Sequence, residues 1–429
     1  MTITFFVFGG NMNYQKIECN GYDIHIINNK KFHTINCRIC FTENSNKELI
    51  TYRNLLMNVL TSATKKYDTK EKFIKECQEL YSLSPVASTV RNGKIQTTKF
   101  SISTVNSSYI SSNNLIENIL LLKEIVLNPL VIDNKFSSKY FDVTKRELEA
   151  ETKTIIEEPR LYANIELLKL MDKEELLSTG YCDLNILKEI DEKKLYQSYK
   201  EMITNSKIDI FISGNIKNTK EVIEVIKNNF IFNSNSKLDN PLIIYKDKLT
   251  KPIIKSETKN YQQSKLSVGY KLYDLTDFEN RYVSFVFDNM LGGGANSLLM
   301  KYIREEKSLC YYINSYSNRL DNILIINSGI KKENYKIVLE AINKIITDIK
   351  NGKFTLKALN ESKMEVLYSL SNIFESNHSI IEYYYGQSVF NSSDINTKIK
   401  MIKKVSPEDI INYANKLNVE GIFFLEGDL

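Results

Sequence analysis

The stretch 289–316 has the sequence NMLGGGANSLLMKYIREEKSLCYYINSY and predicts a turn between two helices. The amphipathic run 277–291 ends at Gly292, Gly293 and Gly294, because glycine weakens a helix interior and readily adopts positive φ at a helix terminus. Three glycines also suggest a phosphate-binding loop. However, no Gly-Lys-Ser/Thr follows them, and Ser297 stands where the dinucleotide fingerprint needs its third glycine. We therefore interpret the glycines as a turn rather than a nucleotide site.

A second helix and a strand follow the glycines. The helix can begin at Asn296 or Ser297, either of which can cap it, and Arg304 lies near its end. Tyr311 opens an apolar, aromatic run that is typical of a strand. Arg304 and Tyr311 could therefore meet at a helix-to-strand corner.

The rest of the chain divides into two similar halves. Residues 1–232 alternate strand-like and helical segments, and residues 256–429 repeat a similar order. Residues 233–255 between them are rich in Asn, Ser, Lys and Asp, show no clear period and read as a linker. Each half finishes with a helix and an apolar strand, in KIDIFISGNI (207–216) and VEGIFFLEGDL (419–429). At 429 residues the chain suits two domains, and we predict an α+β fold with an internal duplication.

Local turn signals place several further elements of the first half. The runs 23–27 and 35–41 are separated by a turn composition and predict an antiparallel hairpin. The runs 85–91 and 95–105 flank Asn92-Gly93, the strongest short hairpin signal. Helical periodicity covers 139–170, with Pro159 marking a kink or a break.

Composition excludes several classes of function. The chain carries 57 basic and 52 acidic residues, interspersed, so its net charge of +5 demands neither a nucleic acid nor an acidic membrane as partner. No apolar run approaches the roughly 18 residues of a membrane span. The apolar segment 1–10 lacks a basic leader and a cleavage site, which makes it a poor signal peptide, and the sequence does not decide between Met1 and Met12 as the start.

The six cysteines point to a reducing compartment. They have no framework spacing, so we expect free thiols and a cytoplasmic protein. Cys37 and Cys40 form a C-x-x-C, but they fall on a predicted strand, where residues three apart point to opposite faces. We therefore interpret both as structural thiols rather than metal ligands.

The segment LGGGANSLLMKYIREEKSLCYYI (291–313) resembles the second-domain signature of the insulinase (pitrilysin) family of zinc peptidases in order and spacing. With the duplicated halves, the resemblance covers nearly the whole chain, and it implies two homologous insulinase-type domains, each an antiparallel-rich sheet packed with helices. In that family an arginine and a tyrosine seven residues later reach from the second domain toward the zinc site of the first. Arg304 and Tyr311 match this pair.

The resemblance also implies roles for these residues. Arg304 would hold the substrate backbone, Tyr311 would stabilise an oxyanion, and Gly292, Gly293 and Gly294 would belong to the substrate-binding segment. A guanidinium suits carbonyl groups, and a phenol suits developing negative charge. In the alternative interpretation, Arg304 caps a helix C-terminus and Tyr311 is an ordinary strand aromatic.

The zinc motif of the family is absent from this chain. Working members carry His-x-x-Glu-His in the first long helix, where histidines one turn apart bind zinc and the glutamate activates a water. This chain has only three histidines, and none is spaced to pair with another: His25, His33 and His378. We expect ordinary polar roles for all three.

Alignment of the family's helix end with Ala63-Thr64 places Asn54, Met57 and Asn58 at the motif positions. Neutral amides are weak zinc ligands, and a thioether cannot act as a general base. The best match to the family's third ligand is Glu151, eight residues before Pro159, although a long acidic helix favours a solvated glutamate there. We therefore expect no metal in this chain and zinc only in a partner.

Two functional hypotheses follow from these observations. In the preferred one, the chain is the non-metal-binding subunit of a heterodimeric zinc peptidase and supplies Arg304 and Tyr311 to a paralogue with an intact His-x-x-Glu-His. A peptide substrate would then add as a strand to a sheet edge, for which 95–105 is the candidate, with an internal strand as the alternative. In the second hypothesis, the chain is a structural or peptide-binding subunit without a catalytic role. The sequence leaves open whether the chain forms a homodimer when no partner is present.

Overall fold

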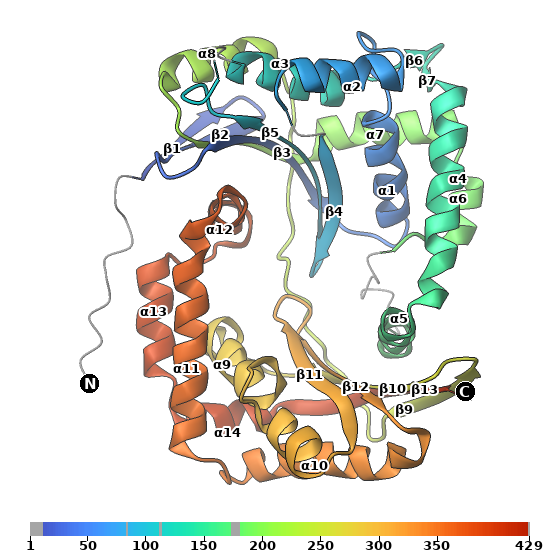
Figure 1. The fold of residues 1–429 in the computed structure, drawn as a ribbon, viewed down its shortest axis with the longest axis vertical. Coiled ribbons are helices and arrows are strands. Elements are labelled where there is room, and N and C mark those ends of the chain that lie inside the picture. The colour runs from blue at the N-terminus through green and yellow to red at the C-terminus, as the bar shows by residue number, and fades with distance from the viewer. Residues whose placement is uncertain (1–11, 83–84, 111–113, 173–180, 428–429) are drawn as a thin grey trace. The chain divides into compact units, whose positions relative to one another are not determined.

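The computed structural model describes residues 12–82, 85–110, 114–172 and 181–427 (Figure 1). The apolar segment 1–10 lies outside the described residues. The chain forms two compact α+β units, and each unit includes a segment from the other half of the sequence. Unit 1 comprises Met1–Thr152, Gly180–Pro241 and Asn372–Ser392, and unit 2 comprises Lys153–Thr179, Leu242–Ser371 and Ser393–Leu429.

Each unit is built on one mainly antiparallel sheet. The strand order is β1-β2-β8-β3-β5-β4 in unit 1 and β9-β13-β10-β12-β11 in unit 2. The strands of unit 1 are β1 (Asn13–Cys19), β2 (Tyr22–Asn28), β3 (Thr34–Asn44), β4 (Val86–Asn92), β5 (Ile95–Val105) and β8 (Lys207–Gly214), with a small pair of β6 (Val131–Ile132) and β7 (Lys135–Phe136). Those of unit 2 are β9 (Ile253–Lys259), β10 (Ser264–Leu272), β11 (Cys310–Asn318), β12 (Ile323–Ile330) and β13 (Leu417–Gly427).

The two sheets share one topology, which confirms the predicted duplication. In unit 1, β2 lies parallel to β8, and β8 lies antiparallel to β3. In unit 2, β9 lies parallel to β13, and β13 lies antiparallel to β10. β5 and β4 extend the first sheet as β12 and β11 extend the second. The two strands with similar sequences at the ends of the halves, β8 and β13, therefore occupy equivalent central places.

Helices follow the strands in corresponding order. Unit 1 contains α1 (Leu49–Leu60), α2 (Lys70–Glu79), α3 (Leu115–Leu127), α4 (Ser138–Thr154, whose last two residues count to unit 2), α6 (Leu184–Glu189), α7 (Glu192–Asn205), α8 (Thr219–Asn229) and α12 (Asn377–Phe390). Unit 2 contains α5 (Pro159–Met171), α9 (Ser284–Asp288), α10 (Tyr335–Lys350), α11 (Leu356–Ser371), α13 (Ile395–Lys404) and α14 (Pro407–Asn415). Among the described residues, none of the helices combines the length and the apolar character needed to cross a membrane.

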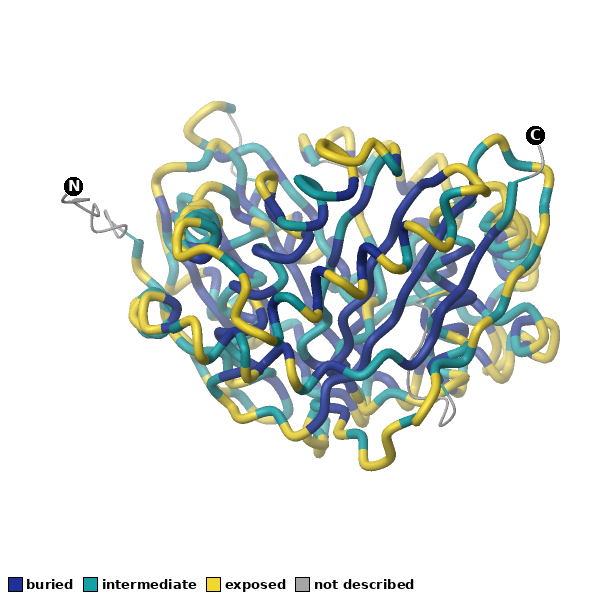
Figure 2. The backbone as a smooth tube through the Cα atoms, turned by 90° about the horizontal axis from the view of Figure 1, so that it is seen from below, coloured by how far each residue is buried: buried dark blue, intermediate teal, exposed yellow. Residues whose placement is uncertain are grey.

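Both faces of each sheet are covered. Buried residues, dark blue in Figure 2, follow the inner strands, and their alternation divides strands such as β3 and β13 between two cores. In β13, Ile422 and Phe424 join the larger core of unit 2, whereas Phe423 and Leu425 join a smaller core with Leu167 of α5. In unit 1, Cys37 belongs to the larger core and Cys40 to a smaller core under α12. The two thiols thus lie on opposite faces, as predicted.

A pair of glycines lets α5 approach the sheet of unit 2. Gly269 of β10 and Gly421 of β13 are directly paired across the two strands. A Cβ at Gly269 would collide with the Met171 sulfur of α5, and one at Gly421 would lie tightly against Met171 at 3.0 Å and Leu167 at 3.1 Å. The helix therefore lies in a shallow groove that side chains at these two positions would fill.

Two strand predictions are wrong. The segments 23–27 and 35–41 do not form a hairpin, because β8 inserts between β2 and β3. The segment 95–105 is not an edge strand, because β5 pairs with both β3 and β4 and leaves β4 as the edge. The Asn92-Gly93 turn and the break before Pro159 are confirmed.

Candidate functional site

The helix α1 carries the three positions predicted to match the missing zinc motif. Its buried face, with Leu55, Leu56 and Val59, packs into the larger core of unit 1. Asn54, Met57 and Asn58 are half-buried on the remaining surface of the helix. The three side chains are therefore placed on one side of a well-anchored helix, but they offer two neutral amides and a thioether.

Asn58 and Glu151 line one cavity of about 340 Å³. Glu151 reaches it from α4, together with Glu147 one turn earlier. The other lining residues are Thr61, Ser62, Lys70, Phe73, Ile74, Cys77, Pro85, Thr144 and Leu148. Burial raises the pKa of the Cys77 thiol to about 11, so it is protonated at neutral pH and is a poor metal ligand. The residues present do not fit a catalytic zinc, which needs three histidine or carboxylate ligands of the right geometry.

Arg304 and Tyr311 lie at the junction of a helix and a strand in unit 2. The π-helix Met300–Glu306 carries Arg304, and β11 begins at Cys310. The Arg304 guanidinium is exposed, and its one hydrogen bond among the described residues is a weak contact of 3.5 Å to the Met300 sulfur. The helix ends instead through backbone bonds, in which the Ser308 amide donates to the Arg304 carbonyl. The guanidinium therefore does not act as a helix cap.

Tyr311 is 55% exposed and falls at an irregularity of the β11–β12 ladder, between Cys310 and Tyr312. The irregularity leaves it outside the regular register, whereas Tyr312 pairs with Gly329. The structure shows no hydrogen bond between Tyr311 and Arg304, both of which are described residues. Both residues are exposed, and Tyr311 forms no side-chain hydrogen bond that the structure describes.

Close packing, and not positive φ, requires glycine at two of the three positions, Gly292 and Gly294. Gly294 is extended, with φ −86° and ψ 157°, and Gly292 and Gly293 lie within a π-helical turn, Asn289–Gly293. A Cβ at Gly292 would come within 2.5 Å of the Ser315 nitrogen on β11, and one at Gly294 within 2.8 Å of the Asn289 carbonyl oxygen. The expectation that these glycines adopt positive φ is therefore wrong. Close packing against β11 explains Gly292, and close packing against Asn289 and Glu365 explains Gly294.

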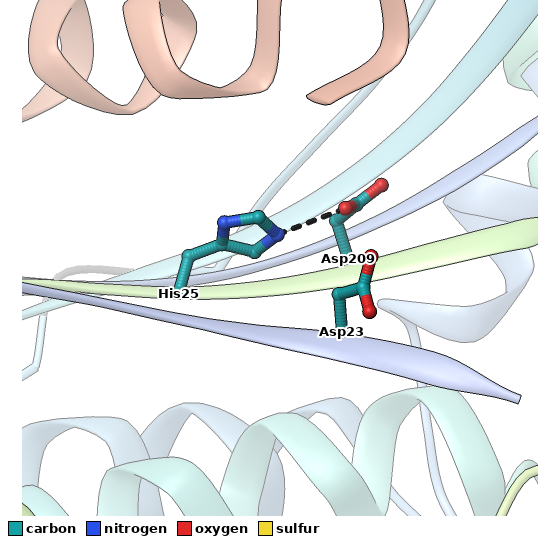
Figure 3. Close-up of side chains that lie close together, drawn as sticks. All are labelled: Asp23, His25 and Asp209. Carbon is teal, nitrogen blue, oxygen red and sulfur yellow. Dashed lines mark hydrogen bonds and ion pairs between the residues drawn. The ribbon is translucent and has the colours of Figure 1, made fainter. Parts of the chain in front are cut away.

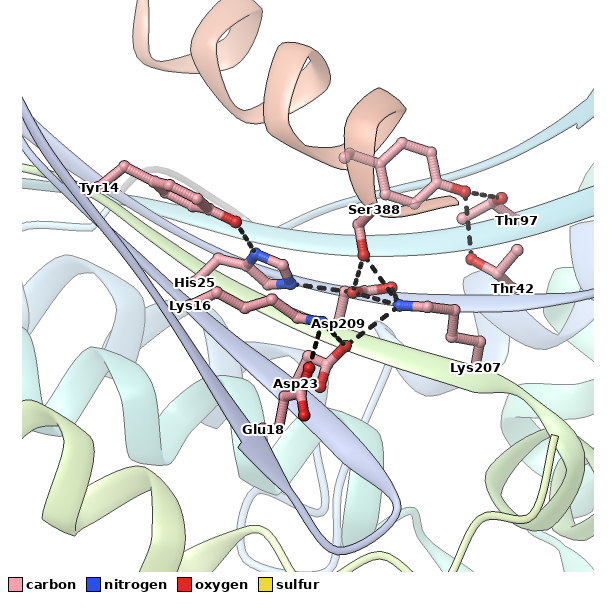
Figure 4. Close-up of polar contacts among 11 residues, drawn as sticks. Tyr14, Lys16, Glu18, Asp23, His25, Thr42, Thr97, Lys207, Asp209 and Ser388 are labelled. Atoms are coloured by element: carbon pink, nitrogen blue, oxygen red, sulfur yellow. Dashed lines mark hydrogen bonds and ion pairs between the residues drawn. The ribbon is translucent and has the colours of Figure 1, made fainter. Parts of the chain in front are cut away.

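A buried polar cluster in unit 1 escaped the sequence interpretation. His25 Nε2 donates to Asp209 Oδ1 over 2.9 Å, and both side chains are inaccessible to solvent, with Asp23 beside them (Figure 3). Figure 4 shows that Lys207 and Ser388 complete the cluster. The available signal was the alternation of polar Asp23 and His25 with isoleucines along β2, which places both on one face.

The cluster has the composition of a metal site, since Asp23, His25 and Asp209 bring three ligand atoms within 4.8 Å of one another. Both carboxylates, however, are already paired with lysines, since the Lys16 ammonium lies 3.1 Å from Asp23 and Lys207 contacts Asp209. The Lys207 ammonium lies 2.6 and 2.8 Å from the two oxygens of Asp209 and 3.5 Å from Asp23. Burial alone would raise the pKa of Asp209, but the His25 hydrogen bond and the Lys207 charge outweigh it and hold that pKa below its usual value. We interpret the cluster as an ion-pair network in which a lysine ammonium takes the place of a metal ion.

Comparisons with known proteins agree with this architecture. The family model described as "Peptidase M16 inactive domain" matches residues 189–366. "Probable inactive metalloprotease YmfF" of Bacillus subtilis is 24% identical over 436 residues, covering 97% of this chain and 98% of the relative. "Uncharacterized zinc protease YmxG" of the same organism is 26% identical over 304 residues, covering 68% and 69%.

Solved structures show the same fold over nearly the full chain. A conserved protein from Enterococcus faecalis has a TM-score of 0.87 at 24% identity, covering 97% of this chain and 99% of that chain. A peptidase M16 inactive domain from Pseudomonas fluorescens has a TM-score of 0.75 at 14% identity, with the same coverage. The sequence signature, the duplicated fold and the full-length relative agree: the chain is similar to inactive members of the insulinase (M16) peptidase family, and its sequence lacks the His-x-x-Glu-His motif.

Proposed function

We propose that this protein is the non-metal-binding subunit of a heterodimeric zinc peptidase. A paralogue with an intact His-x-x-Glu-His would hold the zinc and activate the water, and this chain would supply Arg304 and Tyr311 to the shared active site. The observation that carries the proposal is the exposure of both side chains in a chain whose own motif positions are Asn54, Met57 and Asn58.

Each of the two residues has a simple chemical task in this proposal. The Arg304 guanidinium presents several donors in a planar fork and would hold carbonyl groups of an extended peptide. The Tyr311 hydroxyl would donate to the oxyanion that forms when water attacks the peptide bond. Neither residue would have to release another partner first, because neither forms a strong hydrogen bond within the described structure.

In this proposal both subunits of the heterodimer are cytoplasmic. All six cysteines are free thiols in the structure, and the sequence gives them no disulfide framework. Peptides or short unfolded segments are the proposed substrates, since extended backbone is what Arg304 and a sheet edge can recognise.

The alternative is a structural or peptide-binding subunit without a catalytic role. It is favoured by the cavity at α1, which persists without metal ligands and could hold a side chain of a bound peptide. It is also favoured by Gly292 and Gly294, whose small size is fully explained by packing.

The experiment measures zinc content and cleavage of a quenched peptide pool for this chain alone, for its closest His-x-x-Glu-His paralogue alone and for the mixture. We expect turnover in the mixture, and we expect Arg304→Ala and Tyr311→Phe each to reduce it by roughly 100-fold, the usual cost of losing a transition-state donor. Glu305→Ala on the same helix and Tyr368→Phe, a 70% exposed tyrosine of the same unit, are the matched controls.

The outcomes separate the hypotheses. If the mixture keeps full activity after both replacements, the chain has a structural or binding role only. Zinc and turnover in this chain alone would overturn the assignment of Asn54, Met57 and Asn58 as the degenerate motif.

A further inference from the structure

A cross-strand row in the sheet of unit 2 brings a lysine onto a tyrosine ring. Lys265 of β10, Gly329 of β12 and Tyr312 of β11 are directly paired in this order. Because Gly329 has no side chain, Lys265 can cross over it, and its ammonium lies 5.5 Å from the centre of the Tyr312 ring. A Cβ at Gly329 would collide with that ring and with Gln263. The contact between Lys265 and Tyr312 therefore requires glycine at position 329.

A second cation shares the same ring. Arg160, in the first turn of α5, places its guanidinium carbon 4.9 Å from the centre of the Tyr312 ring. Its Nη2 donates over 2.9 Å to Asn314 Oδ1 on β11. Two positive side chains from separate elements thus converge on one aromatic ring.

Neither positive charge is neutralised. The Lys265 ammonium donates to Gln263 and the Arg160 guanidinium to Asn314, and both acceptors are uncharged amide oxygens. Within the described residues, neither cation forms an ion pair. Lys255 of the same unit behaves differently, since it pairs with Glu166 at 3.0 Å and with Glu257 at 2.6 Å. A lysine of this sheet can therefore find acidic partners, whereas Lys265 has none among the described residues.

The arrangement is costly unless an anion completes it. Lys265 is only 9% exposed, and an ammonium loses hydration when it is buried. Burial, and then the charge of Arg160, lower the pKa of Lys265, as expected for a cation that lacks a counter-charge. The Tyr312 hydroxyl is also buried and has no hydrogen-bond partner among the described residues. Two unpaired cations and an unused hydroxyl are the donors that a carboxylate needs.

We infer that Arg160, Lys265 and Tyr312 form a binding site for a carboxylate group of a peptide. Within the part of the chain that the structure describes, β11 is the terminal strand of its sheet and is paired only with β12, so an extended peptide can add beside it and bring a carboxylate to Arg160. The choice of a peptide as the ligand rests on the proposed function, whereas the preference for a carboxylate rests on the three side chains alone. The carboxylate can be the C-terminus of the peptide or an acidic side chain.

The test measures binding of three fluorescein-labelled octapeptides to this chain alone, without a partner subunit or zinc. The peptides share a sequence of Ala, Val, Thr and Ser. One ends in a free carboxylate, one is amidated, and one is amidated but contains a single internal Glu. We expect at least one carboxylate peptide to bind about tenfold more tightly than the uncharged amide, and the difference between the two carboxylate peptides identifies the source of the group.

Variants assign the effect to the site. Arg160→Gln and Lys265→Met should abolish the preference for a carboxylate, and Tyr312→Phe should reduce it. Lys259→Gln is the control, because Lys259 also lies over a tyrosine ring but on β9, at the opposite edge of the sheet. Arg160 is exposed, so its replacement keeps the test valid if the Lys265 variant does not fold.

Equal affinity for the three peptides, absence of binding, or a carboxylate preference that survives both cation replacements would overturn the inference. The assay measures binding and not catalysis. A negative result would therefore contradict the carboxylate site but not the heterodimeric peptidase, and a positive result does not require that the chain has a catalytic role.

Discussion

Gly292 and Gly293 are adjacent, but replacing each with alanine should change the stability of the protein in opposite directions. A Cβ at Gly292 would press on the Ser315 nitrogen at 2.5 Å and on Leu299 at 2.9 Å, whereas the nearest atom to a Cβ at exposed Gly293 is a carbonyl oxygen at 3.2 Å. We expect Gly292→Ala to lower the free energy of unfolding by about 1–3 kcal/mol through overpacking. Gly293→Ala should be neutral or stabilising by up to about 1 kcal/mol, because alanine restricts the unfolded chain. Urea unfolding of both variants measures the difference.

The same pair tests what the glycines are for. If the turn serves substrate binding in addition to packing, Gly293→Ala should impair peptide turnover in the heterodimer without loss of stability. A Gly292→Ala variant as stable as the parent protein would show that the contact with β11 does not demand glycine.

At the scale of an element, we propose that α1 is the counterpart of the family's zinc helix without its ligands. Asn58 lines the same cavity as Glu151, the predicted match to the third ligand. We expect the triple substitution Asn54→His, Met57→Glu and Asn58→His to create a site that binds about one zinc ion per chain, because two histidines one turn apart then face that carboxylate. Metal analysis after dialysis against micromolar zinc measures the gain.

Two glutamates of α4 provide the control for this prediction. Adding Glu151→Gln to the triple variant should remove the zinc, whereas adding Glu147→Gln, one turn away in the same cavity, should not. If Glu147 proves to be the required residue, the third ligand is misassigned. If the triple variant binds no zinc, the alignment of α1 itself is wrong.

The helix α12 is held on the sheet of unit 1 by charge. Glu382 accepts hydrogen bonds from Arg38 at 2.6 Å and from Lys99 at 2.7 and 2.8 Å. Burial alone would raise the pKa of Glu382, but the Lys99 ammonium and the Arg38 guanidinium outweigh it and hold that pKa below the usual value of 4.5. Since the pKa is lower in the folded state, the carboxylate stabilises the docked helix fully above about pH 4.5 and loses this effect as the pH falls further.

Hydrogen exchange of α12, corrected for intrinsic rates, tests this attachment. Protection of residues 377–390 should fall as the pH drops from 6 to 3.5, and Glu382→Gln should lower it about tenfold already at pH 6, since hydrogen bonds to charged groups contribute about 1.5–3 kcal/mol. In Glu382→Gln, the protection of α12 should still depend on pH, but less strongly, because Asp209 also accepts a hydrogen bond from Ser388 of this helix. Glu375→Gln, at an exposed ion pair with Lys31, is the control. Unchanged protection at pH 6 in Glu382→Gln would contradict the role of this carboxylate.

The sequence predicts an element well where its signal is local. Asn92-Gly93 and Pro159 mark a turn and a break by their own backbone preferences, and both are confirmed. The hairpin of 23–27 with 35–41 failed because β8, more than 160 residues later in the chain, inserts between the two strands. The cluster of Asp23, His25 and Asp209 was missed for the same reason, since β2 and β8 meet only in the folded sheet. Arg160 and Lys265 likewise become neighbours only when α5 docks on unit 2.

At the scale of the whole molecule, the duplication includes an exchange of helices. In unit 2, α5 covers Ile325, Phe423 and Leu425, although it belongs to the first half of the sequence. In unit 1, α12 covers Ile27, Cys40 and Phe211, although it belongs to the second half. Each sheet therefore has one face covered by helices of its own half and the other by a single helix from the other half.

This exchange predicts how the two halves of the sequence behave apart. A fragment 1–232 would expose Leu167 and Met171 of α5 and leave Ile27, Cys40 and Phe211 uncovered, and a fragment 256–429 would leave Phe423 and Leu425 uncovered. Large exposed apolar patches drive association, so we expect each fragment to aggregate when it is produced alone. Produced together, the fragments should elute from a sizing column as one complex at the summed mass of one copy of each. Leu167→Asp and Phe423→Asp place a charge in the contact between α5 and the sheet and should prevent the two fragments from associating. Lys169→Asp, on the exposed side of α5, should not. Two soluble, monomeric fragments that each unfold cooperatively would instead show that a contiguous half is an independent domain and that the exchanged helices are accessory.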